Sequence, residues 1–508
     1  MQLTEEQQAI EARAQALAGS ESLKVIAYAG TGKTTTLRRV AESRAGQGAY
    51  LAFNRSIARE ATGKLHDTGA RVSTMHALAL RAVRDRYGPI ALTATNANAL
   101  RDAGVLQGPG RSGPPWKGLF RWGEYRFAAA AARTVSAFCA SADAHLTEHH
   151  ARKALIDVLG DPKAMGPGPR RERAESALGR LSGPLTQTAT AYFRHALRAG
   201  AFGHDIYLKL ADLSPPLRAA MFDAEDYILI DEAQDLSPVQ RAIVTAAGCP
   251  VVAVGDPYQQ IYSWRGAENA LGHLPGESLY LTGSFRFGPD IAALAGRVLH
   301  SRPDQGPMHP LRGLGSGGYE GWAGAHHAVL CRTNAGVIDA AGHYLRRGFA
   351  VWVDRFDSVV ADMRAALALQ AGRRMEGVSG SMASFWTWSE FVMEARHGTD
   401  AVVTRLCEMI QKGEAEVVFE IDGARVRTAA EAQVVILTCH RAKGMEWPAV
   451  QLWDDFGRID KLNKRYNGAA RKSQRAAELV LEEWNILYVA VTRAVNRVAL
   501  PEDMELPE

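Results

Sequence analysis

The sequence has few cysteines, and their arrangement forms no recognisable site. Its 508 residues include five cysteines, an odd number that is widely spaced and without a Cys-x-x-Cys pair. A disulfide framework requires paired cysteines, and a structural zinc site requires closely spaced ligands. The cysteines therefore indicate neither kind of site, and a reducing cytoplasm is favoured.

Long hydrophobic runs are also lacking. No stretch approaches the roughly 18 consecutive apolar residues that indicate a membrane-spanning helix. The first ten residues, MQLTEEQQAI, are polar and acidic, whereas a signal peptide is basic and then apolar. We therefore expect neither a membrane-spanning segment nor a secretory signal.

Neither sign of charge dominates the chain. There are 59 Lys and Arg against 55 Asp and Glu, which gives +4, so affinity for a polyanion must come from the distribution of charge. Residues 101–200 carry 15 basic and 8 acidic residues, a local excess of +7 that leaves −3 elsewhere. With 47% hydrophobic residues, the composition excludes a disordered or fibrous protein.

Short apolar runs bounded by turn residues recur along the chain, and helical stretches separate most of them. They are LKVIA (23–27), AYLAF (49–53), YILID (227–231), VVAVG (251–255), AVLC (328–331) and VVIL (434–437). Parallel strands that crossover helices bury on both faces have this pattern. The sequence therefore predicts an α/β fold.

Two stretches interrupt the series of strands. Residues 91–203 are mostly helical and basic, and residues 353–428 lack a clear series of strands. We interpret both as insertions, one into each of two α/β cores. The expected parts are 1–90 with 204–275 as the first core, 91–203 as its helical basic insertion, 276–352 with 429–508 as the second core, and 353–428 as a reduced insertion.

The strongest motif is LKVIAYAGTGKTTTL, an expected strand followed by a small-residue loop and a helix. The loop ends in Gly30, Thr31, Gly32, Lys33 and Thr34. In such a loop, backbone N–H groups surround phosphate oxygens, the lysine neutralises their charge, and the threonine hydroxyl can bind Mg²⁺. Ala27 replaces the usual first glycine and should fit unless its φ must be positive. The alternative is a chance match in an ordinary loop.

Acidic residues follow another expected buried strand, where YILI runs into Asp231 and Glu232. At this position an aspartate can hold Mg²⁺ and a glutamate can polarise an attacking water. The alternative is a solvated acidic start of a helix, which the helix dipole favours. The phosphate-binding loop shifts the balance towards the catalytic interpretation.

Further motifs carry a family resemblance. They are DEAQD (231–235), VGDPYQQIYSWRGA (254–267), LTGSFRFGPDIAALA (281–295), CRTNA (331–335), TCHRAKGMEWPAVQLWDDF (438–456) and EEWNILYVAVTRA (482–494). This ordered series resembles that of superfamily 1A DNA helicases of the UvrD/Rep/PcrA type. AFNRSIAREA, SFRFGP and WDDF are most similar to the helicase core of the F-box DNA helicases, with no F-box expected. The resemblance implies two RecA-like parallel-sheet lobes.

The resemblance also implies roles in ATP binding and hydrolysis. Gln7 in LTEEQ would recognise adenine, Phe285 would stack on it, and Glu446 in KGMEW would lie on the ribose side. Gln259 would sense the γ-phosphate, while Arg286 in SFRF and Arg493 in VTRA would contact it. Because both arginines would come from the lobe that lacks the phosphate-binding loop, ATP hydrolysis would depend on closure of the cleft between the lobes. Surface salt bridges are the alternative for both arginines.

The resemblance further implies contacts with a single strand. The residues concerned are Asn54, His76, Tyr262, Trp264, Arg265 and His440. Aromatic faces stack on any base, which gives a sequence-independent grip. Burial in the core is the alternative for the two aromatic residues, and a structural hydrogen bond is the alternative for Asn54 and the histidines.

Each insertion carries a pattern with two interpretations. In the first, the basic residues Arg111, Lys117, Arg121, Arg126 and Arg133 alternate with the aromatics Trp116, Phe120 and Trp122. They indicate either phosphate contacts or a solvated basic face. The aromatic cluster FWTW (385–388) in the second insertion indicates either core packing or a contact.

The activity that the resemblance implies is ATP- and Mg²⁺-dependent 3′-to-5′ translocation on single-stranded DNA, with unwinding at single-strand/duplex junctions, in repair, recombination or genome defence. Two alternatives stay open. One is a translocase that displaces bound proteins, and the other is a DNA-sensing motor subunit beside a nuclease or recombination factor. A cytoplasmic or nucleoid-associated protein without a membrane partner is expected, and RNA is not excluded as a substrate.

Overall fold

The computed structural model describes most of the chain. The described residues are 3–106, 124–165, 168–261, 270–304, 306–316, 327–375, 382, 385, 387–397, 401–472, 474–504 and 506. The chain forms two compact units. The first consists of Met1–Thr282 with Arg471–Ala476, and the second of Gly283–Ala470 with Ala477–Glu508.

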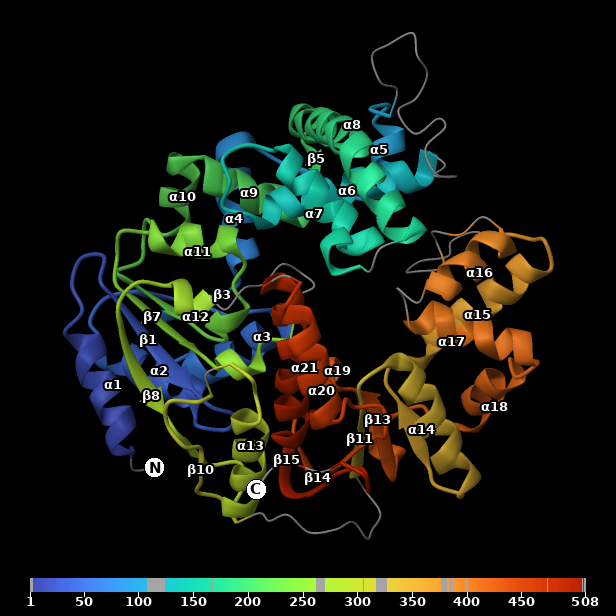
Figure 1. Cartoon of the computed structure of the whole chain (residues 1–508). Helices are drawn as coiled ribbons and strands as arrows, with labels where there is room; N and C mark the ends of the chain where they lie inside the picture. The colour runs from blue at the N-terminus through green and yellow to red at the C-terminus, as the bar shows by residue number, and fades with distance from the viewer. Residues whose placement is uncertain are drawn as a thin grey trace. The chain divides into compact units, whose positions relative to one another are not determined.

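The first unit is built on a parallel sheet of six strands in the order β3-β2-β6-β7-β1-β8 (Figure 1). Its strands are β1 (Ser22–Ala27), β2 (Gly48–Leu51), β3 (Ala70–Ser73), β6 (Tyr227–Ile230), β7 (Val251–Gly255) and β8 (Glu277–Leu281). β2 and β6 pair so that Tyr50 lies opposite Leu229. Because all strands are parallel, their carboxyl ends share one edge of the sheet.

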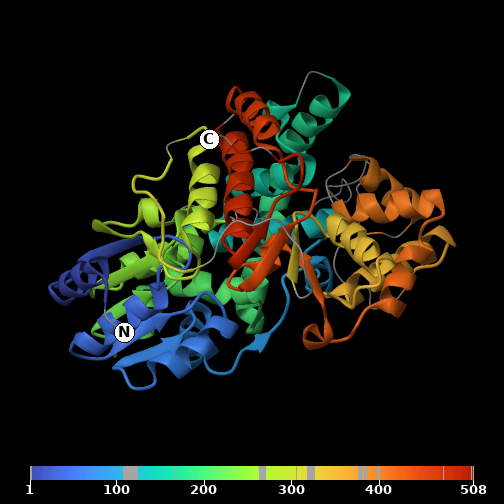
Figure 2. The same cartoon turned by 90° about the horizontal axis from the view of Figure 1, so that it is seen from below.

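Helices cover both faces of this sheet, as Figures 1 and 2 show. They are α1 (Glu5–Gln15), α2 (Lys33–Ser43), α3 (Arg55–Leu65), α4 (Met75–Tyr87), α9 (His204–Leu213), α10 (Pro215–Met221), α11 (Pro238–Thr245) and α12 (Ala270–His273). Side chains alternate between the faces of a strand. Tyr50 and Leu229 accordingly belong to the core beneath α1, α2 and α3, whereas Leu51 and Ile230 belong to the core beneath α4 and α9.

A mostly helical segment, predicted as the first insertion, lies between α4 and α9 along the chain. Its elements are β4 (Ala91–Leu92), α5 (Ala97–Asp102), α6 (Glu124–Ala140), α7 (Glu148–Leu159), α8 (Pro169–Ala199) and β5 (Ala201–Phe202). The alanine-rich sequence of α6 has high helix propensity. Parallel pairing of β4 with β5 joins the chain where it leaves and returns. This segment shares one hydrophobic core with α4 and α9.

The second unit contains a parallel sheet of five strands in the order β12-β13-β11-β14-β15. They are β11 (His327–Cys331), β12 (Val351–Val353), β13 (Val434–Thr438), β14 (Trp447–Leu452) and β15 (Ala494–Ala499). β9 (Gly283–Ser284) and β10 (Arg312–Gly313) form a separate short pair. The α/β class expected from the sequence is confirmed in both units.

The helices of the second unit fall into two groups. One accompanies the sheet and consists of α13 (Pro289–His300), α14 (Asn334–Arg346), α19 (Cys439–Ala442), α20 (Ile459–Ala470) and α21 (Gln474–Val491), whose first residues belong to the segment Arg471–Ala476. The other follows β12 and consists of α15 (Phe356–Gln370), α16 (Trp388–His397), α17 (Ala401–Lys412) and α18 (Glu416–Ala424). The division into cores and insertions stays a prediction.

Candidate functional site

The phosphate-binding loop lies between β1 and α2. β1 ends at Ala27 and α2 begins at Lys33. Gly30 and Gly32 have φ values of 73° and 79°, a left-handed conformation that glycine adopts without steric cost. Among the described residues the non-glycine positions with positive φ are Glu232 and Arg355. Ala27 therefore does not require the conformation of a glycine.

Two threonines brace this loop and the helix that follows it. The Thr31 hydroxyl donates to the Tyr28 carbonyl at 2.8 Å, and the Thr36 hydroxyl donates to the Gly32 carbonyl at 3.1 Å. Gln7 is buried and donates from Nε2 to the Thr36 hydroxyl oxygen at 3.3 Å. These contacts bring Gln7, the residue expected to recognise adenine, beside α2.

Asp231 follows β6 and receives three hydrogen bonds. Its Oδ2 accepts from the Tyr50 hydroxyl at 2.6 Å and from the Thr34 hydroxyl at 3.2 Å. Its Oδ1 accepts from the Glu232 backbone N–H at 2.9 Å. Burial raises the pKa of Asp231, and the charge of Glu232 raises it further, whereas the Tyr50 hydrogen bond and the charge of Lys33 lower it. The carboxylate and the Thr34 hydroxyl supply the hard oxygen donors that Mg²⁺ prefers.

Glu232 has an unusual backbone conformation, with φ at 54°. Such conformations cost energy and concentrate at functional sites. Its Oε1 lies 3.6 Å from the Lys33 ammonium, and its Oε2 accepts from Gln234 Nε2 at 2.7 Å. The first unit thus brings together three predicted catalytic residues, Lys33, Asp231 and Glu232.

A side-chain network extends from Glu232 to Gln259. The oxygen of the Gln234 amide accepts from the Asp256 backbone N–H at 3.0 Å, and Gln259 Nε2 donates to Asp256 Oδ2 at 2.7 Å. A Cβ at Gly255 would collide with the Gln234 side chain, so this position requires glycine. The network connects the predicted γ-phosphate sensor to Glu232, the residue predicted to polarise the attacking water.

The second unit brings together Arg286, Glu446 and Arg493. Arg286 donates from Nε to Glu446 Oε2 at 2.7 Å and from Nη1 to the Thr492 carbonyl at 2.9 Å. Arg493 donates from Nη2 to the Thr492 hydroxyl at 3.3 Å and from Nη1 to the Met445 carbonyl at 3.2 Å. Phe285, beside Arg286, is exposed. Arg286 forms a salt bridge, the alternative to phosphate contact, whereas Arg493 donates to backbone carbonyls and a hydroxyl; the predicted phosphate contacts stay predictions.

Asn54 and His76 have structural contacts in the first unit. Asn54 caps α3 by accepting from the Ile57 backbone N–H at 2.9 Å. The His76 ring packs edge-on against Tyr207, with 6.0 Å between ring centroids. Burial lowers the pKa of His76. In the second unit, His440 lies on α19 and is partly exposed. Their predicted DNA contacts stay predictions.

Several predicted contacts lie outside the described residues. These are Tyr262, Trp264 and Arg265, and, in the first insertion, Arg111, Trp116, Lys117, Phe120, Arg121 and Trp122. The side chain of Arg126 is also outside them, and Arg133 is exposed on α6. In the FWTW segment, Phe385 is buried and packs edge-on against Phe391, on which Trp388 stacks. The core interpretation of these two aromatics is thereby supported.

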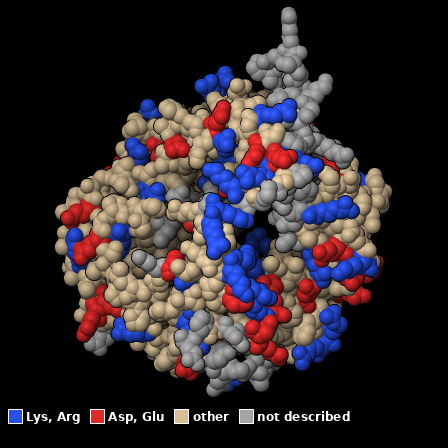
Figure 3. All heavy atoms as spheres, in the orientation of Figure 1, with Lys and Arg blue, Asp and Glu red and all other residues tan. Residues whose placement is uncertain are grey.

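Sequence reasoning missed a basic helix in the second unit. Lys461, Lys464 and Arg465 on α20 are exposed, and Arg471 and Lys472 follow them. Figure 3 shows Lys and Arg side chains gathered near the middle of the face in view. The spacing of these cations was a usable signal, because side chains three and four residues apart share one face of a helix.

Sequence reasoning also missed the roles of Tyr50 and Thr492. The sequence predicts only that Tyr50 lies in a strand. Parallel pairing of that strand with β6 brings Tyr50 to the face of the sheet on which Asp231 lies. Thr492 lies in the quoted VTRA motif, but its shared contact with both arginines depends on the fold.

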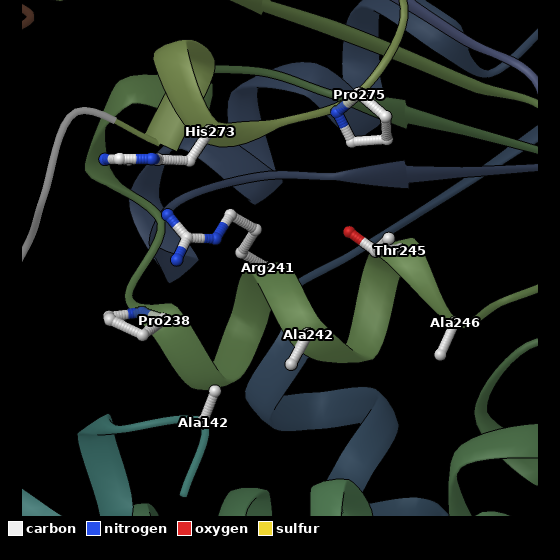
Figure 4. Close-up of a pocket in the computed structure, with 8 residues that line it drawn as sticks. All are labelled: Ala142, Pro238, Arg241, Ala242, Thr245, Ala246, His273 and Pro275. Carbon is white, nitrogen blue, oxygen red and sulfur yellow. The ribbon is translucent and has the colours of Figure 1, made fainter.

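A cavity of about 320 Å³ lies elsewhere in the first unit. Its lining residues are Ala142, Pro238, Arg241, Ala242, Thr245, Ala246, His273 and Pro275. They come from α11, from α12 and the segment after it, and from the α6–α7 connection; Figure 4 shows Arg241 and His273 on the same side. The lining contains none of the predicted site residues.

Two searches of the described residues gave negative results. No helix there is long and apolar enough to cross a membrane. Those residues also contain no cluster of three or more His, Cys, Asp or Glu side chains suited to holding a metal. The five cysteines are free thiols.

Two family models match the chain. Residues 5–272 match the UvrD/REP helicase N-terminal domain, and residues 420–500 match the UvrD-like helicase C-terminal domain. The first match covers more than half of the chain. It includes the phosphate-binding loop, Asp231, Glu232 and Gln259, whereas the second includes Glu446 and Arg493.

Curated relatives agree with these matches. F-box DNA helicase 1 of Gallus gallus is 30% identical over 510 residues, which covers 95% of this chain and 47% of that protein. F-box DNA helicase protein 1 of Schizosaccharomyces pombe is 28% identical over 530 residues, which covers 94% of this chain and 55% of that protein. The chain thus spans about half the length of these relatives. DNA helicase IV of Escherichia coli is 33% identical over 102 residues, which covers 18% of this chain and 15% of that protein.

The family models, the relatives and the parallel sheets lead to one assignment, and the resemblance noted in the motifs is confirmed. The chain belongs to the UvrD/REP helicase family.

Proposed function

We propose that this protein is an ATP- and Mg²⁺-dependent translocase and helicase that moves 3′ to 5′ along single-stranded DNA. The observation that carries the proposal is the group formed by Lys33, Thr34, Asp231 and Glu232 at the carboxyl edge of the first sheet. A phosphate-binding loop next to two carboxylates is the arrangement that phosphoryl transfer to water requires.

Each residue has a chemical role in the proposed hydrolysis. The loop N–H groups and Lys33 would bind the β- and γ-phosphates. Asp231 and Thr34 would hold Mg²⁺, which supplies charge neutralisation on the phosphate oxygens. Glu232 would accept a proton from the attacking water, and its position 3.6 Å from the Lys33 ammonium supports this role.

Arg286 and Arg493 belong to a different unit from Lys33. Arginines directed at a leaving phosphate stabilise charge that develops only in the transition state. Hydrolysis would therefore depend on both units acting together. Gln259 would report the nucleotide state to the segment that carries Trp264, five residues further along the chain.

DNA as the substrate is supported by the family and by the relatives' names. The exposed cations of α20 suit a polyanionic backbone. A role in repair, recombination or genome defence is part of the proposal.

Translocation with strand displacement tests the proposal directly. Duplexes with either a 3′ or a 5′ single-stranded tail are mixed with the protein, ATP and Mg²⁺, and the released strand is measured. We expect release from the 3′-tailed duplex that stops when ATP is replaced by a nonhydrolysable analogue. Preferential release from the 5′-tailed duplex would contradict the proposed 3′-to-5′ polarity. Release that does not require ATP would contradict the proposed ATP-driven translocation.

A further inference from the structure

The Tyr50 hydroxyl makes a short hydrogen bond with the Asp231 carboxylate. The distance from the hydroxyl to Oδ2 is 2.6 Å, against 3.2 Å for the Thr34 hydroxyl at the same oxygen. Tyr50 has no solvent-exposed surface and Asp231 is buried. A hydrogen bond from a neutral donor to a buried carboxylate is stronger than one between two neutral groups.

The pairing of β2 with β6 places Tyr50 and Asp231 on the same face of the sheet. Tyr50 lies opposite Leu229 in the parallel pairing of β2 with β6. Asp231 is two residues beyond Leu229, so its side chain leaves the strand on the same face. The Asp231 backbone N–H also donates to the Leu51 carbonyl at 3.1 Å, which holds the two strand ends in register. The contact is therefore built into the fold.

Tyr50 and Thr34 differ in what they can do once a metal is bound. The Thr34 hydroxyl is a predicted metal ligand, so its oxygen turns towards the ion when the ion is present. The Tyr50 ring is buried in the same core as Leu37 and Leu229, and its hydroxyl donates to Asp231 and also contacts the Thr34 side chain. Of the two hydroxyls on Oδ2, that of Tyr50 is the one that is not predicted to bind the ion.

We propose that Tyr50 is a positioning residue for the magnesium site, whose hydroxyl fixes the orientation of the Asp231 carboxylate. The inference rests on the proposed function of Asp231. Hydrogen-bond partners of metal ligands orient those ligands and affect metal affinity. Removing the hydroxyl should leave the nucleotide cradle intact and weaken the part of nucleotide binding that Mg²⁺ contributes.

The test compares Tyr50→Phe with the parent and with Tyr227→Phe. Tyr227 is a matched control, because it is also buried in this sheet but directs its hydroxyl to the Ala41 carbonyl, at 3.5 Å. Binding of a nonhydrolysable ATP analogue is measured by calorimetry in Mg²⁺ and in EDTA, and half-saturating Mg²⁺ is measured for ATP hydrolysis. Thermal unfolding without nucleotide checks that each variant is folded.

For Tyr50→Phe we expect unchanged analogue affinity in EDTA and a reduced gain in affinity on adding Mg²⁺. Half-saturating Mg²⁺ should rise about ten-fold, the size typical of losing a hydrogen-bond partner of a metal ligand. Tyr227→Phe should match the parent. In an Asp231→Asn background, Tyr50→Phe should cause no further change, because the carboxylate that it orients is gone.

Three results would overturn the inference alone. They are a Mg²⁺ dependence of Tyr50→Phe equal to that of the parent, an equal loss in Tyr227→Phe, and unfolding of Tyr50→Phe while Tyr227→Phe stays folded. The last result would make the hydroxyl a requirement for folding. A parent protein without Mg²⁺-dependent analogue binding would overturn the proposed function as well, so the two failures are distinguishable.

Discussion

Arg286 and Arg493 share a hydrogen-bond acceptor residue, since the first donates to the Thr492 carbonyl and the second to the Thr492 hydroxyl. The second unit thus holds the two predicted γ-phosphate arginines next to each other before any nucleotide is considered. Because Thr492 directly precedes Arg493, movement of this turn would displace both guanidinium groups.

We predict that Arg493→Ala lowers the turnover number for ATP far more than it lowers ATP affinity. The charge of this arginine is most useful as the γ-phosphate leaves, and such arginines are worth about 10³–10⁵ in rate in other phosphoryl-transfer enzymes. Steady-state ATPase kinetics and equilibrium binding measure the two effects. Arg405→Ala is the control, because Arg405 on α17 pairs with Asp339 on α14 and is not a predicted site residue. Lost affinity with unchanged turnover would contradict the assignment.

Lys33→Ala should abolish ATP hydrolysis while single-strand binding stays within a few-fold of the parent. The substitution removes the cation that lies 3.6 Å from Glu232 and would neutralise phosphate charge, but no predicted DNA contact. Lys64→Ala is a matched control, since Lys64 is an exposed lysine paired with Glu60. ATPase rates and fluorescence anisotropy with labelled DNA make the comparison. Hydrolysis at the parental rate would show that the loop does not act on phosphate.

Replacing Lys464 and Arg465 with glutamine should weaken the salt dependence of single-stranded DNA binding. In a plot of the logarithm of the binding constant against the logarithm of the salt concentration, each lost phosphate contact makes the slope shallower by about 0.7 on single strands. Loss of two contacts therefore predicts a slope shallower by about 1.4. Binding is measured by titration at several salt concentrations. A control protein with Arg38 and Lys64 replaced loses the same amount of charge from the first unit, at cations that pair with carboxylates; Lys464 also lies 4.0 Å from Asp460. Equal slopes in all three proteins would make α20 a solvated face.

Stability should fall as the pH drops from about 6.5 towards 4, in part through His327. Burial lowers the pKa of His327 to about 4, and its Nε2 lies 3.3 Å from the Tyr344 hydroxyl. In the unfolded chain His327 takes up a proton near pH 6.5, whereas in the folded chain it does not. Its contribution to the free energy of unfolding is therefore complete above pH 6.5 and is lost as the pH falls towards 4. The loss can reach about 3 kcal/mol.

The contribution of His327 is isolated by comparing the parent with His327→Gln. Urea unfolding at pH 7.5 and pH 5 should show a smaller pH dependence in the variant. His343→Gln is the control, because burial also lowers the pKa of that histidine, which is far less buried than His327. Identical pH dependence in the parent and in His327→Gln would contradict the role of burial.

The strands that sequence reasoning identified are mostly interior ones. In the first sheet, β2, β6, β7 and β1 were predicted, whereas the edge strands β3 and β8 were not. Interior strands are buried on both faces and form continuous apolar runs. The edge strand β15, with the sequence AVNRVA, exposes Asn496 and Arg497 and lacks that signal. β14 is interior, but Pro448 and Gln451 interrupt its apolar run.

The candidate site divides in a similar way. Residues of the phosphate-binding loop are adjacent in sequence, so a local pattern predicts them. The contact of Tyr50 with Asp231 spans 181 residues and depends on the order of the strands. No pattern within either segment contains that order. The Arg286–Glu446 pair likewise joins residues 160 apart.

The central claim is that nucleotide hydrolysis by this chain responds to single-stranded DNA. The most direct measurement is the ATPase rate of the full chain with no nucleic acid, single-stranded DNA, duplex DNA and RNA under one set of conditions. We predict a low basal rate, the largest stimulation by single-stranded DNA and less by duplex DNA or RNA. A rate that is the same in all four conditions, or that rises only with RNA, would contradict the account.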